Sequence, residues 1–313
     1  MIKRTLYFGN PAYLSLNLKQ LVVKLPEIEQ DANMPEQVKK EAIASIPIED
    51  IGLLILDHSR ITLTQALMSE LLENNVALIT CNSTHHPCGM MLNLDGNTLQ
   101  AKRFMAQIES SLPLKKQLWQ QTVKQKINNQ GILLEKQRQG DAQMLYNMAK
   151  QVRSGDPENF EGRAAAYYWQ HIFGVESNFI RDREGNKPNT WLNYGYSILR
   201  ACVARSLVGS GLLPTLGIHH RNQYNSYCLA DDIMEPYRPF VDELICGLLH
   251  KFPKTEGELT TEIKKELLII PAIDVEIDNN KSPLMVALQR TTAGLVKCFE
   301  GKANKIPYPA MNL

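Results

Sequence analysis

The residues best suited to chemistry gather in one stretch, Gly217–Pro239, which lies between two apolar segments. This stretch contains two histidines, three carboxylates and two arginines, namely His219, His220, Asp231, Asp232, Glu235, Arg221 and Arg238. Carboxylate oxygens combined with an imidazole suit magnesium or manganese better than structural zinc. The stretch therefore predicts half of a divalent metal site.

Helical spacing would bring two of these carboxylates together. From Leu229 onward the apolar residues recur at roughly helical intervals, so Asp232 and Glu235 are expected at positions i and i+3 of one helix face. Pro236 cannot donate a backbone hydrogen bond and Pro239 favours a new first turn, so a kink or break is expected there. Such a break would expose these side chains to a cleft.

Each of these residues also has an ordinary structural explanation. Glu235 or Asp231 could form an exposed ion pair with Arg238 that stabilises the fold by about a few tenths of a kcal/mol. His219 or His220 could cap a helix or lie in the core with its hydrogen bonds satisfied. The metal site is favoured by the combination, because the two carboxylates follow a histidine by 12 and 15 residues.

Composition limits the classes of protein to consider. The 313 residues can bury a sizeable core, and we expect two domains. A formal net charge of +1 gives no general attraction for polyanions, so nucleic-acid binding would need a local patch. Residues 101–153 offer one, with ten Lys and Arg against three acids, although a solvated helix face would explain the same run.

The cysteines and the apolar runs indicate where the protein works. The six cysteines form no Cys-x-x-Cys pair, and several lie in apolar runs, as reduced buried thiols do. The N-terminus shows no signal segment, and no run reaches the ~18 to 20 apolar residues that span a bilayer. We therefore expect a cytoplasmic protein that has no membrane partner.

The pattern of the chain predicts an α+β fold. A small N-terminal β-rich domain, residues 1–97, is expected to precede a larger all-helical C-terminal domain, residues 98–313. Strands are expected at residues 5–8, 14–18, 21–23, 51–56 and 76–81, with one helix at residues 64–74. A polar stretch that contains Pro87, Gly89 and Asp95-Gly96 ends the strand-like pattern.

Helical patterns follow through most of the second half. They cover residues 102–111, 115–128, 141–153, 190–208, 229–248 and 259–270, and Ser282 with Pro283 would open a final helix. A strand pair around residues 278–280 would be compatible with the pattern. Asp156 or Asn159 would cap a helix that holds Glu161 in its first turn, where a glutamate is often only a favourable partner of the helix dipole.

Three motifs carry a family resemblance. They are Glu161 in Asn-Phe-Glu-Gly-Arg-Ala-Ala, His220 in Leu-Gly-Ile-His-His, and Glu235 in Asp-Asp-Ile-Met-Glu-Pro-Tyr-Arg-Pro-Phe-Val-Asp. These motifs closely resemble the metal-site motifs of the CRISPR-associated protein one family, the integrase of spacer acquisition. Segments at residues 46–51, 61–63, 71–76 and 87–90 also resemble members from type II systems, so the resemblance covers essentially the whole chain.

The resemblance implies a fold, an assembly and a site. It implies a β-sandwich-like N-terminal domain, a helical catalytic domain, a homodimer and a larger complex with CRISPR-associated protein two. It places the catalytic and metal-ligating roles on Glu161, His220 and Glu235, with Asp232 as a nearby acid and Mg²⁺ or Mn²⁺ as cofactor. Here His219 precedes His220, where the family usually has one histidine. His220 is favoured because it keeps the usual offset from Gly217.

The activity implied by the family is that of a DNA endonuclease and integrase in antiviral defence. The 3′-hydroxyl of a captured double-stranded prespacer attacks the repeat end in a CRISPR array, and no covalent protein intermediate forms. The basic run at residues 101–153, with Arg163 and Arg221, would contact DNA phosphates. Two alternatives stay open: a stand-alone metal-dependent DNA nuclease without integration activity, and a non-catalytic DNA-binding or structural protein.

Overall fold

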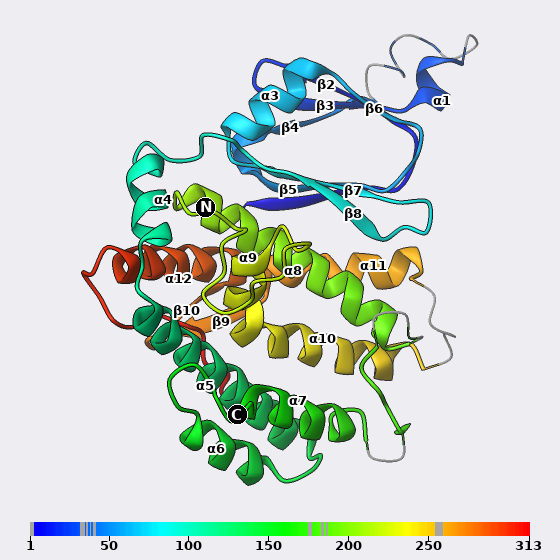
Figure 1. The fold of residues 1–313 in the computed structure, drawn as a ribbon. Helices are drawn as coiled ribbons and strands as arrows, with labels where there is room; N and C mark the ends of the chain where they lie inside the picture. Colours follow the sequence, from blue (N-terminus) through cyan, green and yellow to red (C-terminus); the bar gives the residue numbers. More distant parts are fainter. Residues whose placement is uncertain are drawn as a thin grey trace. The chain divides into compact units, whose positions relative to one another are not determined.

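The chain forms two compact units, Met1–Gly96 and Asn97–Leu313 (Figure 1). The structure is a computed structural model that describes residues 3–31, 35, 37, 39, 42–174, 177–182, 185, 187–253 and 259–313. Strands dominate the first unit and helices the second, which confirms the mixed α+β class. The assignment of separate functions to two domains stays a prediction.

Two four-stranded sheets form the first unit. The first sheet has the order β1-β5-β7-β8, made by β1 (Arg4–Phe8), β5 (Ile51–Leu56), β7 (Ala77–Cys81) and β8 (Pro87–Met91). Its first three strands are parallel, and β8 is antiparallel to β7. The second sheet has the order β4-β3-β2-β6, made by β4 (Ala44–Pro47), β3 (Gln20–Lys24), β2 (Ala12–Asn17) and β6 (Ile61–Leu63).

The two sheets share one apolar core with helix α3 (Gln65–Glu73), and a short helix, α1 (Pro26–Glu29), follows β3. Leu14 from β2, Leu54 from β5 and Leu71 from α3 are all buried in this core. The predicted strands at 51–56 and 76–81 and the helix at 64–74 are confirmed. The strand β8 was missed because Pro87 resembles a loop residue. It opens an edge strand, a position that tolerates proline because the missing N–H is not needed for pairing.

Helices make up most of the second unit (Figure 1). They are α4 (Gln100–Ile108), α5 (Leu112–Gln137), α6 (Ala142–Gln151), α7 (Phe160–His171), α8 (Asn189–Gly209), α9 (Cys228–Met234), α10 (Arg238–Lys251), α11 (Thr261–Leu267) and α12 (Leu284–Phe299). This unit also contains the 3-10 turns η3 (Glu235–Tyr237) and η4 (Ile270–Ala272), and the first unit contains η1 (Ile48–Asp50). The apolar helix α8 is buried on nearly all sides by α9, α10, α12 and η4. The long helix α5 packs against α6, α7 and η3, and these contacts build the site described below.

The prediction that the second domain is all-helical is wrong, because this unit also contains two strands, at the place where a strand pair was expected around residues 278–280. Strands β9 (Asp274–Ile277) and β10 (Asn280–Pro283) form an antiparallel hairpin. Asp278 and Asn279 take positive φ angles of 49° and 62° at its turn, a conformation that Asp and Asn adopt more easily than most residues. Ser282 lies in β10 rather than at the helix cap, and Pro283 precedes α12 without a side-chain cap.

Two expectations about the chain as a whole can be compared with the structure. No helix among the described residues is long and apolar enough to cross a membrane. All six cysteines carry free thiols, as predicted. The cytoplasmic location itself stays a prediction.

A buried carboxylate joins three helices of the second unit. Asp242 on α10 accepts hydrogen bonds from the hydroxyls of Tyr168 on α7, at 2.8 Å, and Tyr196 on α8, at 2.5 Å. Burial raises the pKa of Asp242 to about 6, although both hydroxyls and the nearby Arg238 act to lower it. The ring of Tyr196 also lies 4.5 Å from the Arg238 guanidinium carbon, so this cluster reaches the site residues.

The raised pKa of Asp242 predicts a pH dependence of stability. The folded protein holds this proton more tightly than the unfolded chain, whose ordinary aspartate pKa is 3.8. The stabilising contribution is therefore complete below about pH 4 and is lost as the pH rises through 6, on the order of 3 kcal/mol. We expect the Asp242→Asn variant to lose this slope, measured as the difference in urea unfolding free energy between variant and wild type from pH 4 to 7. Parallel pH profiles for the two proteins would contradict the assignment.

Candidate functional site

The N-terminus of α7 fixes Glu161. Asn159 adopts a positive φ of 53° and accepts a hydrogen bond from the Gly162 N–H at 3.2 Å. The two carboxylate oxygens of Asp156 accept from the N–H groups of Phe160 and Glu161, each at 2.9 Å. Because both predicted capping residues act together, three N–H groups of the first turn are satisfied and the position of Glu161 is determined.

The predicted break at Pro236 positions Glu235. Helix α9 ends at Met234, and η3 carries Glu235 and Pro236 before α10 begins. The amide of Asn129 on α5 donates to the Pro236 carbonyl at 2.7 Å, so a buried side chain holds the backbone at the break. Lys126 lies one turn before Asn129 on α5. The same face of α5 therefore contacts the break and the carboxylate of Glu235.

Glu161 and Glu235 converge on the ammonium group of Lys126. The Lys126 Nζ lies 2.5 Å from Glu161 Oε1 and 2.5 Å from Glu235 Oε2. One ammonium group therefore bridges the two carboxylates. Arg238 Nε lies 2.8 Å from Glu235 Oε1. Burial alone would raise the pKa of Glu235, but Arg238 and then Lys126 hold it at about 2. Burial acts to lower the pKa of the Lys126 amine, but the charges of Glu235 and Glu161 outweigh it and raise this pKa, so the amine is charged near neutral pH.

Asp232 orients the loop that presents His220. Its carboxylate is fully buried and accepts from the backbone N–H groups of Ile218, His219 and His220 at 2.7, 2.9 and 3.2 Å. His220 Nδ1 lies 2.5 Å from Asp232 Oδ1, which leaves Nε2 as the ring nitrogen able to bind a metal. A Cβ at Gly217 would lie 2.7 Å from Asp232 Oδ2, so glycine is needed there. The Asp232 carboxylate therefore positions the loop through three backbone N–H groups and the His220 ring.

The two adjacent histidines have different surroundings. The His219 ring stacks on Trp119 of α5, with ring centroids 4.1 Å apart and an interplanar angle of 2°. The His220 ring meets the edge of the same indole at 5.6 Å. His219 is thus held by stacking, whereas His220 is held by the Asp232 carboxylate. This difference favours His220 as the ligand, in agreement with its offset from Gly217.

The structure gathers Glu161, His220 and Glu235 into one region, although 59 and 15 residues separate them in sequence. After the hydrogen bond to Asp232, the negative charges of Glu235 and Glu161 also act to raise the pKa of His220. In the part of the chain that the structure describes, no three His, Cys, Asp or Glu side chains are close enough to enclose an ion as they stand. The ammonium of Lys126 occupies the space between the two carboxylates.

The donor set nevertheless fits a divalent cation. Glu235 Oε2 is buried and accepts no hydrogen bond of good geometry from any described residue. A buried carboxylate oxygen that accepts no hydrogen bond is stable only beside a positive charge. In this structure the Lys126 ammonium supplies that charge. Two glutamate oxygens and one imidazole nitrogen would leave coordination positions open for a substrate.

Sequence reasoning missed two charged members of this cluster. Lys126 was only one of ten basic residues in the run from 101 to 153, and Arg238 was weighed only as an exposed partner of Glu235 or Asp231. In the structure, Lys126 is 7% exposed and the Glu235 side chain is 6% exposed. The available signal for Lys126 was its place between the apolar residues Val123 and Ile127, both of which are fully buried.

Solved structures with the same fold define the class of protein. A casposase bound to integration product aligns with a TM-score of 0.77 at 20% identity, over 97% of this chain and 92% of that chain. A Cas1 protein from Thermotoga maritima aligns with a TM-score of 0.70 at 16% identity, over 96% and 98% of the two chains. A chain of a Cas6-RT-Cas1–Cas2 complex gives 0.72 at 20% identity, over 97% of this chain and 35% of that chain. The fold is therefore of the Cas1 type.

Sequence comparison identifies the family. The family model described as CRISPR associated protein Cas1 matches residues 9–268. The CRISPR-associated endonuclease Cas1 of Neisseria meningitidis serogroup C is 36% identical over 291 residues, 93% of this chain and 90% of the relative. A CRISPR-associated endonuclease Cas1 of Pyrobaculum aerophilum is 24% identical, over 83% and 91% of the two chains. This chain belongs to the Cas1 family, and the resemblance seen in its motifs is confirmed.

The different surroundings of the two histidines predict opposite pKa shifts. The hydrogen bond that His220 Nδ1 donates to Asp232 raises the pKa of His220 above its usual value, and burial followed by the neighbouring His220 lowers the pKa of His219. NMR titration of the imidazole nitrogens of the metal-free protein should therefore give two midpoints on opposite sides of about 6.5. The Asp232→Asn variant should lower the midpoint of His220. Midpoints in the reverse order would show that the loop is held in another way.

Proposed function

We propose that this chain is a divalent-metal-dependent DNA endonuclease and integrase that inserts new spacers into a CRISPR array. The reaction is a transesterification, in which a 3′-hydroxyl of a double-stranded prespacer attacks a phosphodiester bond at the repeat. The observation that carries the proposal is the convergence of Glu161, Glu235 and an oriented His220 in a chain of the Cas1 family. The casposase of the same fold, bound to integration product, supports strand joining as the chemistry.

Each residue of the cluster has a defined part in this proposal. Glu161, His220 and Glu235 would hold Mg²⁺ or Mn²⁺, which when bound neutralises charge on the phosphate and lowers the pKa of the attacking hydroxyl. Asp232 keeps the Nε2 of His220 directed away from its own carboxylate. The positive charge of Arg238 keeps Glu235 ionised. The ionised carboxylate is a better metal ligand than the protonated carboxyl. No side chain is required as a covalent nucleophile.

The stand-alone nuclease is the alternative reading. It would use water in place of the 3′-hydroxyl at the same site, so the geometry of Glu161, His220 and Glu235 fits both reactions. The comparison with a casposase bound to integration product favours strand joining. The two functions differ in their products, since only an integrase joins a short duplex covalently to a repeat-bearing plasmid.

Two basic groups beside the His220 loop are candidates for contacts with DNA phosphates. Lys115, near the start of α5, lies close enough to Arg221 that burial and then this guanidinium lower the pKa of Lys115. Neither side chain forms an ion pair with an acid among the described residues. A DNA phosphate would relieve the repulsion between the two like charges. Arg163, the third candidate, is exposed on α7 over the ring of Phe160.

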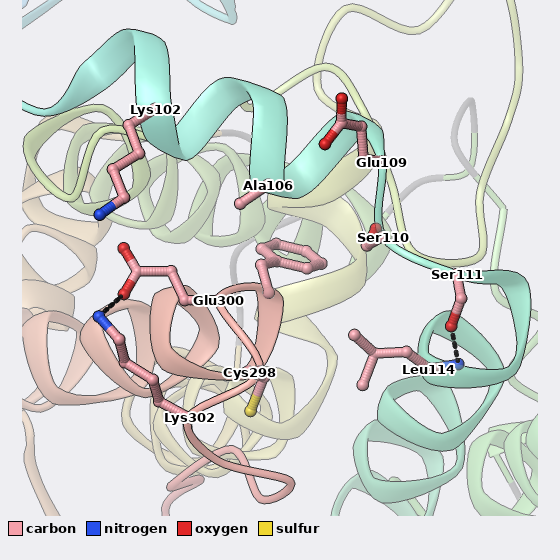
Figure 2. A pocket seen from close by; sticks show the side chains of 11 residues that line it. Lys102, Ala106, Glu109, Ser110, Ser111, Leu114, Cys298, Glu300 and Lys302 are labelled. Carbon is pink, nitrogen blue, oxygen red and sulfur yellow. Dashed lines mark hydrogen bonds and ion pairs between the residues drawn. The ribbon is translucent and has the colours of Figure 1, made fainter.

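A groove between α5 and α6 offers a second place for the DNA backbone. It encloses about 450 Å³ and has no acid in its lining, which consists of Lys124, Asn128, Gln143, Tyr146, Ala149 and Lys150. The larger hollow in Figure 2, between α4, the start of α5 and the end of α12, has a different charge pattern. There Glu300 pairs with Lys302, faces Lys102, and shares the hollow with Glu109. The α5–α6 groove therefore suits a phosphate chain better.

The proposal includes two partners besides DNA. We propose a homodimer, and a larger complex with the Cas2 protein of the same system. The support for Cas2 is the similar fold of a chain in a Cas6-RT-Cas1–Cas2 complex. A strand-transfer assay with and without the small partner protein tests whether this chain needs it to join DNA.

Replacing the proposed ligands should abolish strand joining. We expect Glu161→Gln, His220→Ala and Glu235→Gln each to lower the rate by about 100-fold or more, because each loses one ligand of the activating cation. The matched control is Glu243→Gln, which removes an exposed carboxylate of α10 that pairs with Lys136. Joined products from a 3′-hydroxyl duplex and a repeat plasmid are counted by sequencing. Full activity in excess EDTA, or in the variants, would overturn the metal-dependent mechanism.

Neutralising the α5–α6 groove should weaken DNA binding regardless of sequence. The double variant Lys124→Gln/Lys150→Gln should bind duplex DNA more weakly, and its slope of log affinity against log salt should fall by about 2. The control, Lys265→Gln/Lys281→Gln, removes two exposed lysines from α11 and β10. Fluorescence anisotropy across a salt series provides the measurement. An unchanged slope in the groove variant would exclude this groove from the DNA path.

A further inference from the structure

Lys126 lies between the two glutamates, in the place where a bound cation would be expected. Its side chain is 8% exposed, and its Nζ lies 2.5 Å from an oxygen of each carboxylate, Glu161 and Glu235. A lysine is rarely this deeply buried unless opposite charges surround it. The three residues come from α5, α7 and η3, so one ammonium group joins three separate elements.

The charges of this cluster balance without a metal ion. Two carboxylates, Glu161 and Glu235, face two cations, Lys126 and Arg238. A divalent ion added to this arrangement would leave two excess positive charges in a place largely shielded from water, which is unfavourable. Binding of the ion is therefore easier if one of the two cations withdraws.

Lys126 is the cation better placed to withdraw. Its ammonium group contacts both proposed ligands, and its flexible four-carbon side chain can move without any change in α5. Of the two glutamates, Arg238 pairs with Glu235. Its guanidinium carbon also lies 4.5 Å from the centre of the Tyr196 ring. Tyr196 in turn donates to the buried Asp242. Arg238 is thus held on two sides, whereas the ion pairs of Lys126 with described residues are those with the two carboxylates that a metal ion would take.

We propose that Lys126 is a placeholder cation. It keeps Glu161 and Glu235 together in the metal-free protein and leaves their oxygens when a divalent ion binds. That the incoming ion is Mg²⁺ or Mn²⁺ rests on the proposed function. Without Lys126 the two carboxylates would repel each other in the metal-free site. With it, the site stays assembled, but every ion that binds must displace the ammonium, and this competition lowers the apparent affinity.

Removing the ammonium should strengthen metal binding and weaken the metal-free fold. We expect Lys126→Met to bind Mn²⁺ roughly tenfold more tightly than wild type, as measured by electron paramagnetic resonance of free Mn²⁺ at fixed pH and without DNA. Its metal-free melting temperature should fall by about 5 °C or more, and saturating Mn²⁺ should restore most of that loss. The control Lys265→Met, which alters an exposed lysine of α11, should match wild type in both measurements.

The outcomes separate this inference from the proposed function. Equal or weaker Mn²⁺ binding by Lys126→Met, with wild type binding Mn²⁺, would overturn the placeholder role alone and indicate that the ammonium stays beside the ion. Absence of Mn²⁺ binding by both proteins would overturn the metal-dependent function as well. Tighter binding by Lys126→Met supports both.

Wild-type protein provides a second test that does not depend on the folding of a variant. If Mn²⁺ displaces the ammonium, Lys126 should react severalfold faster with an amine-acylating reagent in the presence of Mn²⁺, as quantified by mass spectrometry. Lys124 provides the internal control, because its labelling should not change. Equal labelling of Lys126 with and without bound Mn²⁺ would overturn the proposal.

Discussion

Buried charge is the constraint on which the helical unit depends. Lys126, Glu161, Glu235 and Arg238 lie largely out of water, and each is stable there only because an opposite charge lies beside it. The pairs connect α5, α7 and the break between α9 and α10. The apolar contacts of α8 build the core, but the ion pairs specify which side chains of the outer helices must meet.

Three acids of one short stretch serve three different partners. Asp231 pairs with Arg200 on α8, Asp232 holds the backbone of the His220 loop, and Glu235 faces α5. The sequence groups Asp232 and Glu235 as neighbours on a helix face. The structure separates their roles, because backbone N–H groups surround one and cationic side chains surround the other. Because Asp232 binds both the loop backbone and the His220 ring, a single carboxylate fixes the direction of the imidazole.

Local pattern was enough to predict most elements, because apolar spacing and capping act within a few residues. The strand at 51–56, the caps Asp156 and Asn159 and the break at Pro236 all follow from such short-range rules. The strand pair expected around residues 278–280 is the hairpin β9–β10, although the domain as a whole was predicted to be all-helical, and Pro87 hid an edge strand. The role of Lys126 could not be seen, because it depends on Glu161, 35 residues further along the chain. Residue types and spacing pointed to a histidine, Asp232 and Glu235 as half of a metal site, and the family resemblance added Glu161 and favoured His220.

The stacking of Trp119 on His219 has an optical consequence. The indole is 1% exposed and lies parallel to an imidazole of the same loop that carries His220. Fluorescence of a tryptophan depends on the ring that lies against it, and a protonated imidazole quenches the indole. The chain has only two other tryptophans, Trp169 and Trp191. Replacing those two with phenylalanine would leave an emission signal that reports the state of the loop directly, in real time and without an attached dye.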